Sequence, residues 1–133
     1  MGAPYEDTAA SAAGSTYIMT NVTLDSESSE TRSLADAKLQ LTGVASADHS
    51  GQSLTGGDMN GDGYGDIWIG APREDSGGQG AGAAYLVLGP VSTMSSDLAS
   101  ADEMIIGDAS KDYFGWALEA GGDIDGSFRP TFP

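Results

Sequence analysis

The sequence repeats itself, and this repetition limits the possible folds more than any other feature. The opening GAPYED returns later as GAPRED, and two further segments match at nearly the same spacing. The matching pairs are residues 2–7 with 70–75 (shift 68), 34–55 with 98–119 (shift 64) and 56–61 with 121–126 (shift 65). A unit of about 65 residues therefore occurs twice, which fits a propeller blade with its loops and is too long for most helical repeats.

The length of 133 residues suits one domain or a piece of one. We therefore interpret residues 1–133 as a single propeller segment. It divides into a first repeat unit at residues 2–69, a second at residues 70–126 and an irregular tail at residues 127–133.

The composition excludes several kinds of partner and site. Five Lys and Arg against twenty Asp and Glu give a formal net charge of −15, which repels nucleic acid and anionic membranes. The chain has no Cys, so disulfide frameworks and thiolate sites are excluded. Its longest apolar stretch, residues 83–88, is far shorter than the roughly twenty residues of a spanning helix. Residues 1–7 show no secretory signal pattern, so we expect no membrane insertion and no signal peptide in this chain.

Short apolar runs bounded by Gly, Pro, Asp or Ser predict an all-β fold. The expected strands are residues 16–20, 38–41, 52–54, 67–69, 83–88, 103–106 and 116–118. Residues 85–88 are apolar at every position, so both faces of that strand should be covered by stacked sheets. The polar, acidic residues 23–38 are read as a solvated loop, with a short helix as the alternative.

The segment GDMNGDGYGDIWIGAP, residues 57–72, carries the most specific chemistry. Oxygen-bearing side chains occupy positions one, three, five and nine of a glycine-rich loop: Asp58, Asn60, Asp62 and Asp66. The backbone carbonyl of Tyr64 at position seven adds another oxygen. Hard oxygen ligands of this kind select Ca²⁺, so the sequence predicts one calcium site here.

Two alternatives compete with this calcium loop. An EF-hand opens with the same pattern, but its twelfth position needs a bidentate Glu and here that position is Ile69. A metal-free turn is the simpler alternative, because Asp, Asn and Gly are ordinary turn residues. Three carboxylates within nine residues repel one another without a cation, however, and this favours the metal.

The loop pattern DxNxDGxxD, the apolar strand after it, the GAP of residues 70–72 and the Phe-Gly pair at 114–115 resemble the FG-GAP repeat of integrin α-subunit β-propellers and bacterial relatives. The resemblance covers nearly the whole chain, about two repeats. It implies a calcium-stabilised propeller of about seven four-stranded blades. Such propellers are typically extracellular or on the cell surface and serve adhesion or ligand recognition. The metal ligands that it implies are Asp58, Asn60, Asp62, Tyr64 and Asp66.

The sequence departs from the family pattern in three places. Ser50 stands where the second unit has Phe114. The second loop begins with Asp123 and Asp125 but continues without further carboxylates, so these two are only a weak second candidate for a metal site. The repeats are also out of register at both ends of the chain, which predicts one complete blade of four antiparallel strands plus parts of two neighbours.

We expect no enzymatic activity, because the sequence brings together no nucleophile, base and oxyanion donors. His49 is the one histidine, and the repeat alignment puts it opposite Tyr113, in an aromatic slot at a strand entry. Trp68 and Trp116 lie among apolar residues, which favours packing over stacking on a sugar. The alternative for the whole chain is a non-catalytic propeller fragment of a larger secreted hydrolase or adhesin.

The unpaired strands at both ends of the complete blade predict self-association. Exposed edges and apolar faces are templates for pairing with another chain. A head-to-tail contact closes into a ring when the rotation suits, and two blades per chain give a trimer with six blades or a tetramer with eight. The expected partners are other copies of the chain and a protein or glycan ligand.

Overall fold

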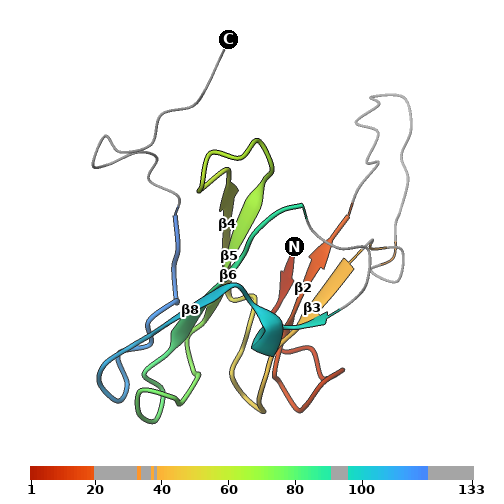
Figure 1. Ribbon diagram of the computed structural model, residues 1–133. Helices are drawn as coiled ribbons and strands as arrows, with labels where there is room; N and C mark the ends of the chain where they lie inside the picture. The colour runs from red at the N-terminus through yellow and green to blue at the C-terminus, as the bar shows by residue number, and fades with distance from the viewer. Residues whose placement is uncertain (20–32, 34–36, 38, 91–95, 120–133) are drawn as a thin grey trace.

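The computed structural model describes residues 1–19, 33, 37, 39–90 and 96–119, and these are almost entirely strand and loop (Figure 1). The elements are β1 (Gly2–Ala3), β2 (Ser15–Ile18), β3 (Leu39–Thr42), β4 (Ser53–Gly57), β5 (Asp66–Ala71), β6 (Ala83–Val87), β7 (Ser96–Asp97), the 3-10 helix η2 (Leu98–Ser100) and β8 (Glu103–Ile106). They form two four-stranded sheets, in the orders β1-β2-β3-β7 and β4-β5-β6-β8. The predicted all-β class is confirmed, and the two sheets are consistent with propeller blades.

The second sheet is a complete four-stranded blade. β4 pairs with β5, β5 with β6 and β6 with β8, each pair antiparallel. Side chains alternate between its two faces, so Ile67 and Ile69 share one face of β5 while Trp68 lies on the other. β4, β5 and β6 follow one another in the chain as a meander, as the short apolar runs separated by turn residues predict. β7 and η2 lie between β6 and β8.

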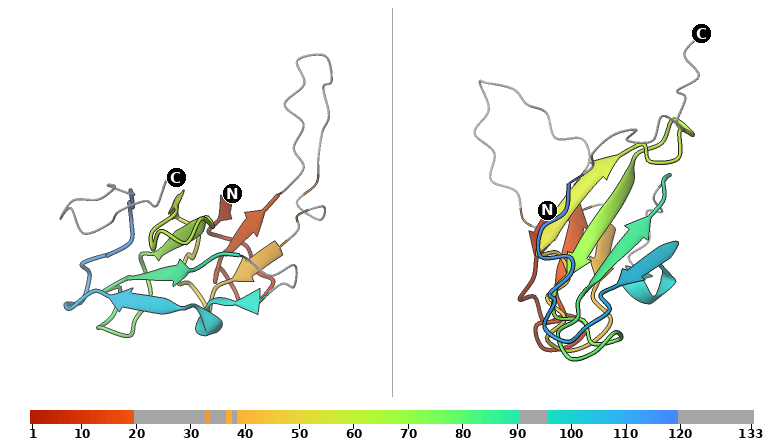
Figure 2. Two further views of the ribbon diagram at one scale, coloured as in Figure 1. Left: turned by 45° about the horizontal axis from the view of Figure 1, so that its top comes forward. Right: turned by 90° about the vertical axis from the view of Figure 1, so that its left-hand side faces the viewer.

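The first sheet is built differently from what the sequence predicts. β1 pairs with β2 and β2 with β3, both antiparallel, and β7 then adds to β3 in parallel. β7 follows β6 in the chain, so the second repeat unit supplies a short edge strand to the first sheet (Figure 2). This exchange ties the two sheets together. β1 and β7 have two residues each, too few for a periodic pattern in the sequence.

The sequence repeat appears again in the backbone pairing. Ser15 pairs with Thr42 between β2 and β3, and Ala83 pairs with Ile106 between β6 and β8, the same pairing after shifts of 68 and 64 residues. Isolated parallel bridges follow the same rule, with Gly14 to Ser50 in one unit and Gly82 to Phe114 in the other. The unit boundaries themselves stay a prediction from the sequence.

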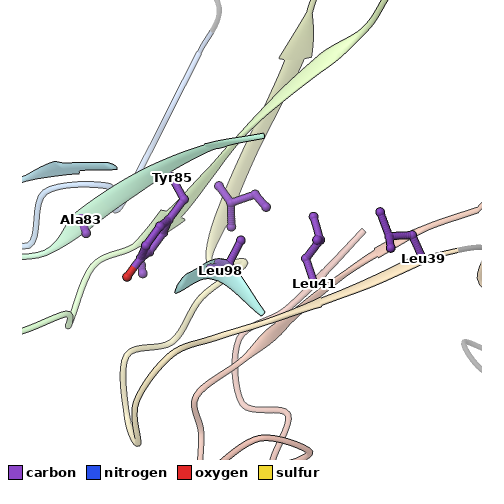
Figure 3. Packing of buried hydrophobic residues seen from close by; sticks show 7 residues of the cluster. Leu39, Leu41, Ala83, Tyr85 and Leu98 are labelled. Atoms are coloured by element: carbon purple, nitrogen blue, oxygen red, sulfur yellow. The ribbon is translucent and has the colours of Figure 1, made fainter. Parts of the chain in front are cut away.

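The hydrophobic core lies between the two sheets (Figure 3). β3 contributes two leucines, η2 contributes one, and β5 and β6 present the facing side chains. The buried cluster comprises Leu39, Leu41, Ile69, Ala71, Ala83, Tyr85 and Leu98. This packing covers one face of the second sheet, whereas the unbroken apolar run of β6 predicts stacked sheets on both faces.

The predicted strand at residues 116–118 is wrong. Residues 116–117 form a bend, and Trp116 is 57% exposed, with its ring edge-on to Tyr113 at a centroid distance of 6.5 Å. The equivalent residues of the first unit lead into β4, which forms because β5 pairs with it. Within the described part of the chain no strand pairs with residues 116–118, and an apolar run without a ladder partner does not become a strand.

Candidate metal centre

The candidate metal loop connects β4 to β5. Gly57 at the end of β4 pairs with Asp66 at the start of β5, so residues 58–65 form a closed hairpin loop. The loop projects from the upper end of the second sheet in Figure 1. All five predicted ligand residues are therefore held in this one loop and at its closing pair.

Asp58 organises the first half of the loop. Its Oδ1 accepts hydrogen bonds from the amides of Gly61 at 2.9 Å and Asp62 at 3.2 Å, and its Oδ2 accepts one from Gly63 at 2.9 Å. The backbone wraps around the carboxylate because Gly61 and Gly63 have positive φ angles of 74° and 88°, which L side chains rarely adopt. The glycines thus serve the turn geometry that the sequence pattern predicts.

The next two polar side chains also fold back on the loop. Asn60 Oδ1 accepts a hydrogen bond from the amide of Asp62 at 3.4 Å, and Asp62 Oδ1 accepts one from the amide of Tyr64 at 2.9 Å. Asp58, Asn60 and Asp62 are all exposed. Their carboxylate and amide oxygens therefore remain accessible from solvent.

Asp66 differs from the others because it is buried, with 1% of its surface exposed. Its Oδ2 accepts a hydrogen bond from the amide of Met59 at 2.7 Å, and its Oδ1 accepts one from the amide of Gly89 at 2.8 Å. Asp66 consequently links the base of the metal loop to the chain that leaves β6. The sequence identifies this residue as a ligand but gives no sign of this second, structural role.

The residues present fit a hard cation by their chemistry. The set offers three carboxylates, an amide oxygen and a backbone carbonyl. Both described Lys or Arg residues, Arg73 and Lys111, follow the ends of β5 and β8 that lie opposite to this loop. A carboxylate has about four lone-pair sites, of which Asp62 uses one and Asp58 three. The side chains are turned toward loop amides, and the described residues contain no group of three or more His, Asp or Glu side chains placed to share an ion. The ligand set stays a prediction, and Asp123 and Asp125 lie outside the described residues.

A second acidic cluster, which the sequence does not reveal, lies at the opposite strand ends. Asp48 and Glu74 are buried, with 4% and 9% of their surfaces exposed, near Tyr85 of β6. Glu74 accepts hydrogen bonds from the amide and hydroxyl of Ser76, as Glu6 does from Thr8 in the first unit. In both GAP segments a Glu precedes a hydroxyl residue by two positions, Glu6 before Thr8 and Glu74 before Ser76. This recurrence is the one sequence signal that indicates the role of Glu74.

Burial changes the acid–base properties of this cluster. Desolvation raises the pKa of Asp48 to about 6. The hydrogen bond from the Ala45 amide lowers this pKa, and the negative charges of Glu74 and Asp75 raise it further.

The neighbouring His49 packs its ring against Tyr5 at a centroid distance of 4.7 Å, and burial together with the charge of Arg73 lowers its pKa. The observed ring contact agrees with the aromatic slot that the repeat alignment predicts for His49.

Comparison with known proteins locates the repeat. Residues 50–87 match the FG-GAP repeat family. The matched segment runs from the bridge at Ser50 through β4, the metal loop and β5 to the end of β6. Within it, the GAP of the FG-GAP repeat closes β5, whereas Ser50 stands in place of the aromatic residue. The resemblance predicted from the sequence is confirmed at these residues.

A curated relative carries the same resemblance beyond the matched segment. Integrin alpha-PS2 of Drosophila melanogaster is 38% identical over 78 residues, which is 56% of this chain and 5% of that protein. The chain therefore spans a small fraction of that integrin subunit. Among the residues that the structure describes, no helix has the length and apolar character to cross a membrane.

Proposed function

We propose that this chain is a calcium-stabilised segment of a propeller-type adhesion or recognition module, working outside the cell or at its surface. The observation that carries the proposal is the oxygen-rich loop between β4 and β5, which lies inside the FG-GAP match. The similarity to an integrin α subunit supports the same kind of role. It also supports a module without catalysis, either alone or as a non-catalytic part of a larger secreted hydrolase or adhesin.

Calcium would be held by Asp58, Asn60, Asp62, Asp66 and the Tyr64 carbonyl. The bound ion supplies positive charge that offsets the repulsion among three carboxylates. The chain's own part is positional: Asp58 follows β4 and Asp66 begins β5, so ligands from both strand ends come from one closed hairpin. A loop stabilised in this way keeps the blade ordered, which a recognition surface requires.

Asp62→Ala is expected to remove most of the calcium-dependent rise in melting temperature. Extracellular calcium modules bind with Kd values of about 10⁻⁴ to 10⁻³ M, and calcium at 100 times Kd stabilises the folded state by about 2.7 kcal/mol. Asp62 is exposed and makes one loop hydrogen bond through its side chain, so the metal-free variant should fold normally. Thermal unfolding with calcium and with chelator measures the difference.

Two comparison variants make this test specific. Asp108→Ala removes the same charge from an exposed position outside the loop and should leave the calcium response unchanged. Asp123→Ala should have a much smaller effect than Asp62→Ala, because the second loop lacks carboxylates at positions five and nine. An unchanged calcium response in Asp62→Ala rules out the assigned ligands.

Self-assembly into a ring is the second part of the proposal. The outer face of the second sheet carries a small apolar pocket of about 150 Å³ lined by residues that include Trp68, Ile105 and Phe114. Ile105 is 42% exposed, and its repeat equivalent is Leu41, which is buried in the core between the sheets. In a head-to-tail contact this outer face would meet the first sheet of a second copy. It would meet that sheet on its free face, because the other face of the first sheet already packs against the second sheet of its own chain.

Light scattering of the full chain at micromolar concentration with calcium is expected to report three or four copies. Ile105→Asp should shift the mass to that of one copy, because the contact between copies would then bury the new carboxylate without a partner of opposite charge. Glu103→Asp, at an exposed position on the same strand, is the matched variant that should keep the assembly. A wild-type chain that stays a monomer contradicts the ring.

A further inference from the structure

A polar pocket lies at the strand ends opposite to the metal loop. It has a volume of about 360 Å³ and is formed by three loops, the first at residues 46–47, the second within residues 73–80 and the third within residues 111–113. These loops lie together at the lower end of the molecule in Figure 1. The pocket therefore spans the junction of the two repeat units, and its size falls in the range of small-molecule sites.

The pocket gathers positive charge in an otherwise acidic chain. Arg73 and Lys111 both line it, and they are the two Lys or Arg residues among those that the structure describes. Over residues 1–19, 39–90 and 96–119, no carboxylate comes within 4.0 Å of either side chain. Asp75 also lines the pocket, but its Oδ1 accepts a hydrogen bond from the Gly80 amide at 2.7 Å. The buried carboxylates of Asp48 and Glu74 lie beside these loops, so the surroundings of the pocket are acidic. The Arg73 and Lys111 side chains are therefore the groups of the pocket that can attract an anion, by direct contact.

Backbone geometry fixes the pocket walls before any ligand arrives. Ala47, Lys111 and Tyr113 have positive φ angles of 64°, 66° and 53°, although they are not glycines. Backbone hydrogen bonds hold two of these strained residues. The Ala47 amide donates to the backbone carbonyl of Ser11 at 2.8 Å, and the Lys111 amide donates to that of Gln79 at 2.9 Å. Non-glycine residues held in this region cost about 1 kcal/mol or more each, and they concentrate at binding sites.

We propose that this pocket binds an acidic monosaccharide, a sugar ring that carries one carboxylate. Arg73 and Lys111 would bind the carboxylate through charge-assisted hydrogen bonds. Ser46, Gln79 and Tyr113 offer neutral hydroxyl and amide groups for the ring hydroxyls, and Tyr113 adds an aromatic face that is 40% exposed. The proposal specifies the ligand of the recognition module proposed above and is independent of the calcium site.

A sugar suits the pocket better than an acidic peptide does. Peptides are commonly held along a free strand edge or in an apolar groove. This pocket is made of loops, and its largest aliphatic side chain other than the cation stems is Ala47. The net charge of −15 opposes any anion at long range, but salt screens it beyond about 8 Å under physiological conditions. The nearby carboxylates of Asp75, Asp48 and Glu74 still oppose an anion at short range, so binding depends on its direct contact with Arg73 and Lys111.

Calorimetric titration of the full chain with glucuronate, in chelator so that calcium cannot bridge to the sugar, tests the proposal. The expected Kd is on the order of 1 mM, with glucose binding at least about tenfold more weakly. Arg73→Gln and Lys111→Gln should each weaken glucuronate binding about tenfold or more, because each removes a charge-assisted hydrogen bond. Melting temperatures of the variants confirm that they fold.

Ala99→Glu is the matched control, since it changes the net charge by the same amount at an exposed residue of η2, outside the pocket. It should retain binding within about twofold if the pocket and not the overall field is responsible. Equal losses in Ala99→Glu and Arg73→Gln, equal binding of glucose and glucuronate, or tighter binding of a glutamate-containing tripeptide each overturn the proposal. A calcium response without glucuronate binding rejects this inference alone, and glucuronate binding without a calcium response rejects the metal proposal alone.

Discussion

Asp66→Ala is expected to lower the free energy of unfolding by about 2–4 kcal/mol even when no calcium is present. The substitution removes the acceptor for the amides of Met59 and Gly89, which lie at 2.7 and 2.8 Å from the carboxylate oxygens. Hydrogen bonds to a charged group contribute about 1.5–3 kcal/mol each, and two donors lose their partner at a site that is 1% exposed. Chemical denaturation in chelator measures the loss.

The matched variants separate this structural role from metal binding. Asp62→Ala should change the metal-free stability by less than about 0.5 kcal/mol, because exposed positions are tolerant. Asp66→Asn keeps one acceptor oxygen and should fall between the wild type and Asp66→Ala. A metal-free Asp66→Ala chain as stable as the wild type contradicts the view that Asp66 ties the loop to the chain after β6.

The strands of the second sheet were predictable because each has enough residues to show a pattern. The ends of β5, β6 and β8 differ from the ends of the predicted runs by fewer than three residues. The prediction works here because apolar residues bounded by Gly, Asp and Pro are a local signal. β1 and β7 were not predictable, because each consists of two residues whose conformation depends on a distant partner strand. The failure at residues 116–118 has the same cause in reverse: an apolar run has strand character only where a partner completes the ladder.

The metal loop was predictable in its residues but not in its contacts. Asp58 and the glycines lie in one local turn, so their spacing in the sequence reports their geometry. The contact from Asp66 to Gly89 spans 23 residues, and no local pattern encodes it. The cationic pocket is equally hidden, because Arg73 and Lys111 are 38 positions apart and reach the same pocket only through the pairing of β5, β6 and β8.

The buried acid Asp48 shows how these long-range contacts control stability. Burial, with Glu74 and Asp75 as nearby negative charges, raises its pKa from 3.8 to about 6 in the folded protein. The folded state thus binds the proton more tightly than the unfolded state does. The neutral, protonated Asp48 therefore contributes stability to the folded state, and this contribution is fully present below about pH 4. It is lost as the pH rises through about 6, because the folded chain then holds a buried carboxylate.

Asp48→Asn is therefore expected to raise the free energy of unfolding at pH 8 by roughly 1–3 kcal/mol and to change it little at pH 4. The amide oxygen of Asn can still accept the hydrogen bond from the Ala45 amide, which lies 3.1 Å from the Asp48 carboxylate, so the local turn is preserved. Denaturation of both chains at the two pH values measures the difference directly. Asp75→Asn is the control, because it removes a neighbouring charge from an exposed side chain and should give a smaller gain at pH 8. If Asp48→Asn stabilises the chain equally at pH 4 and pH 8, its effect comes from packing, and the buried carboxylate does not set the pH dependence.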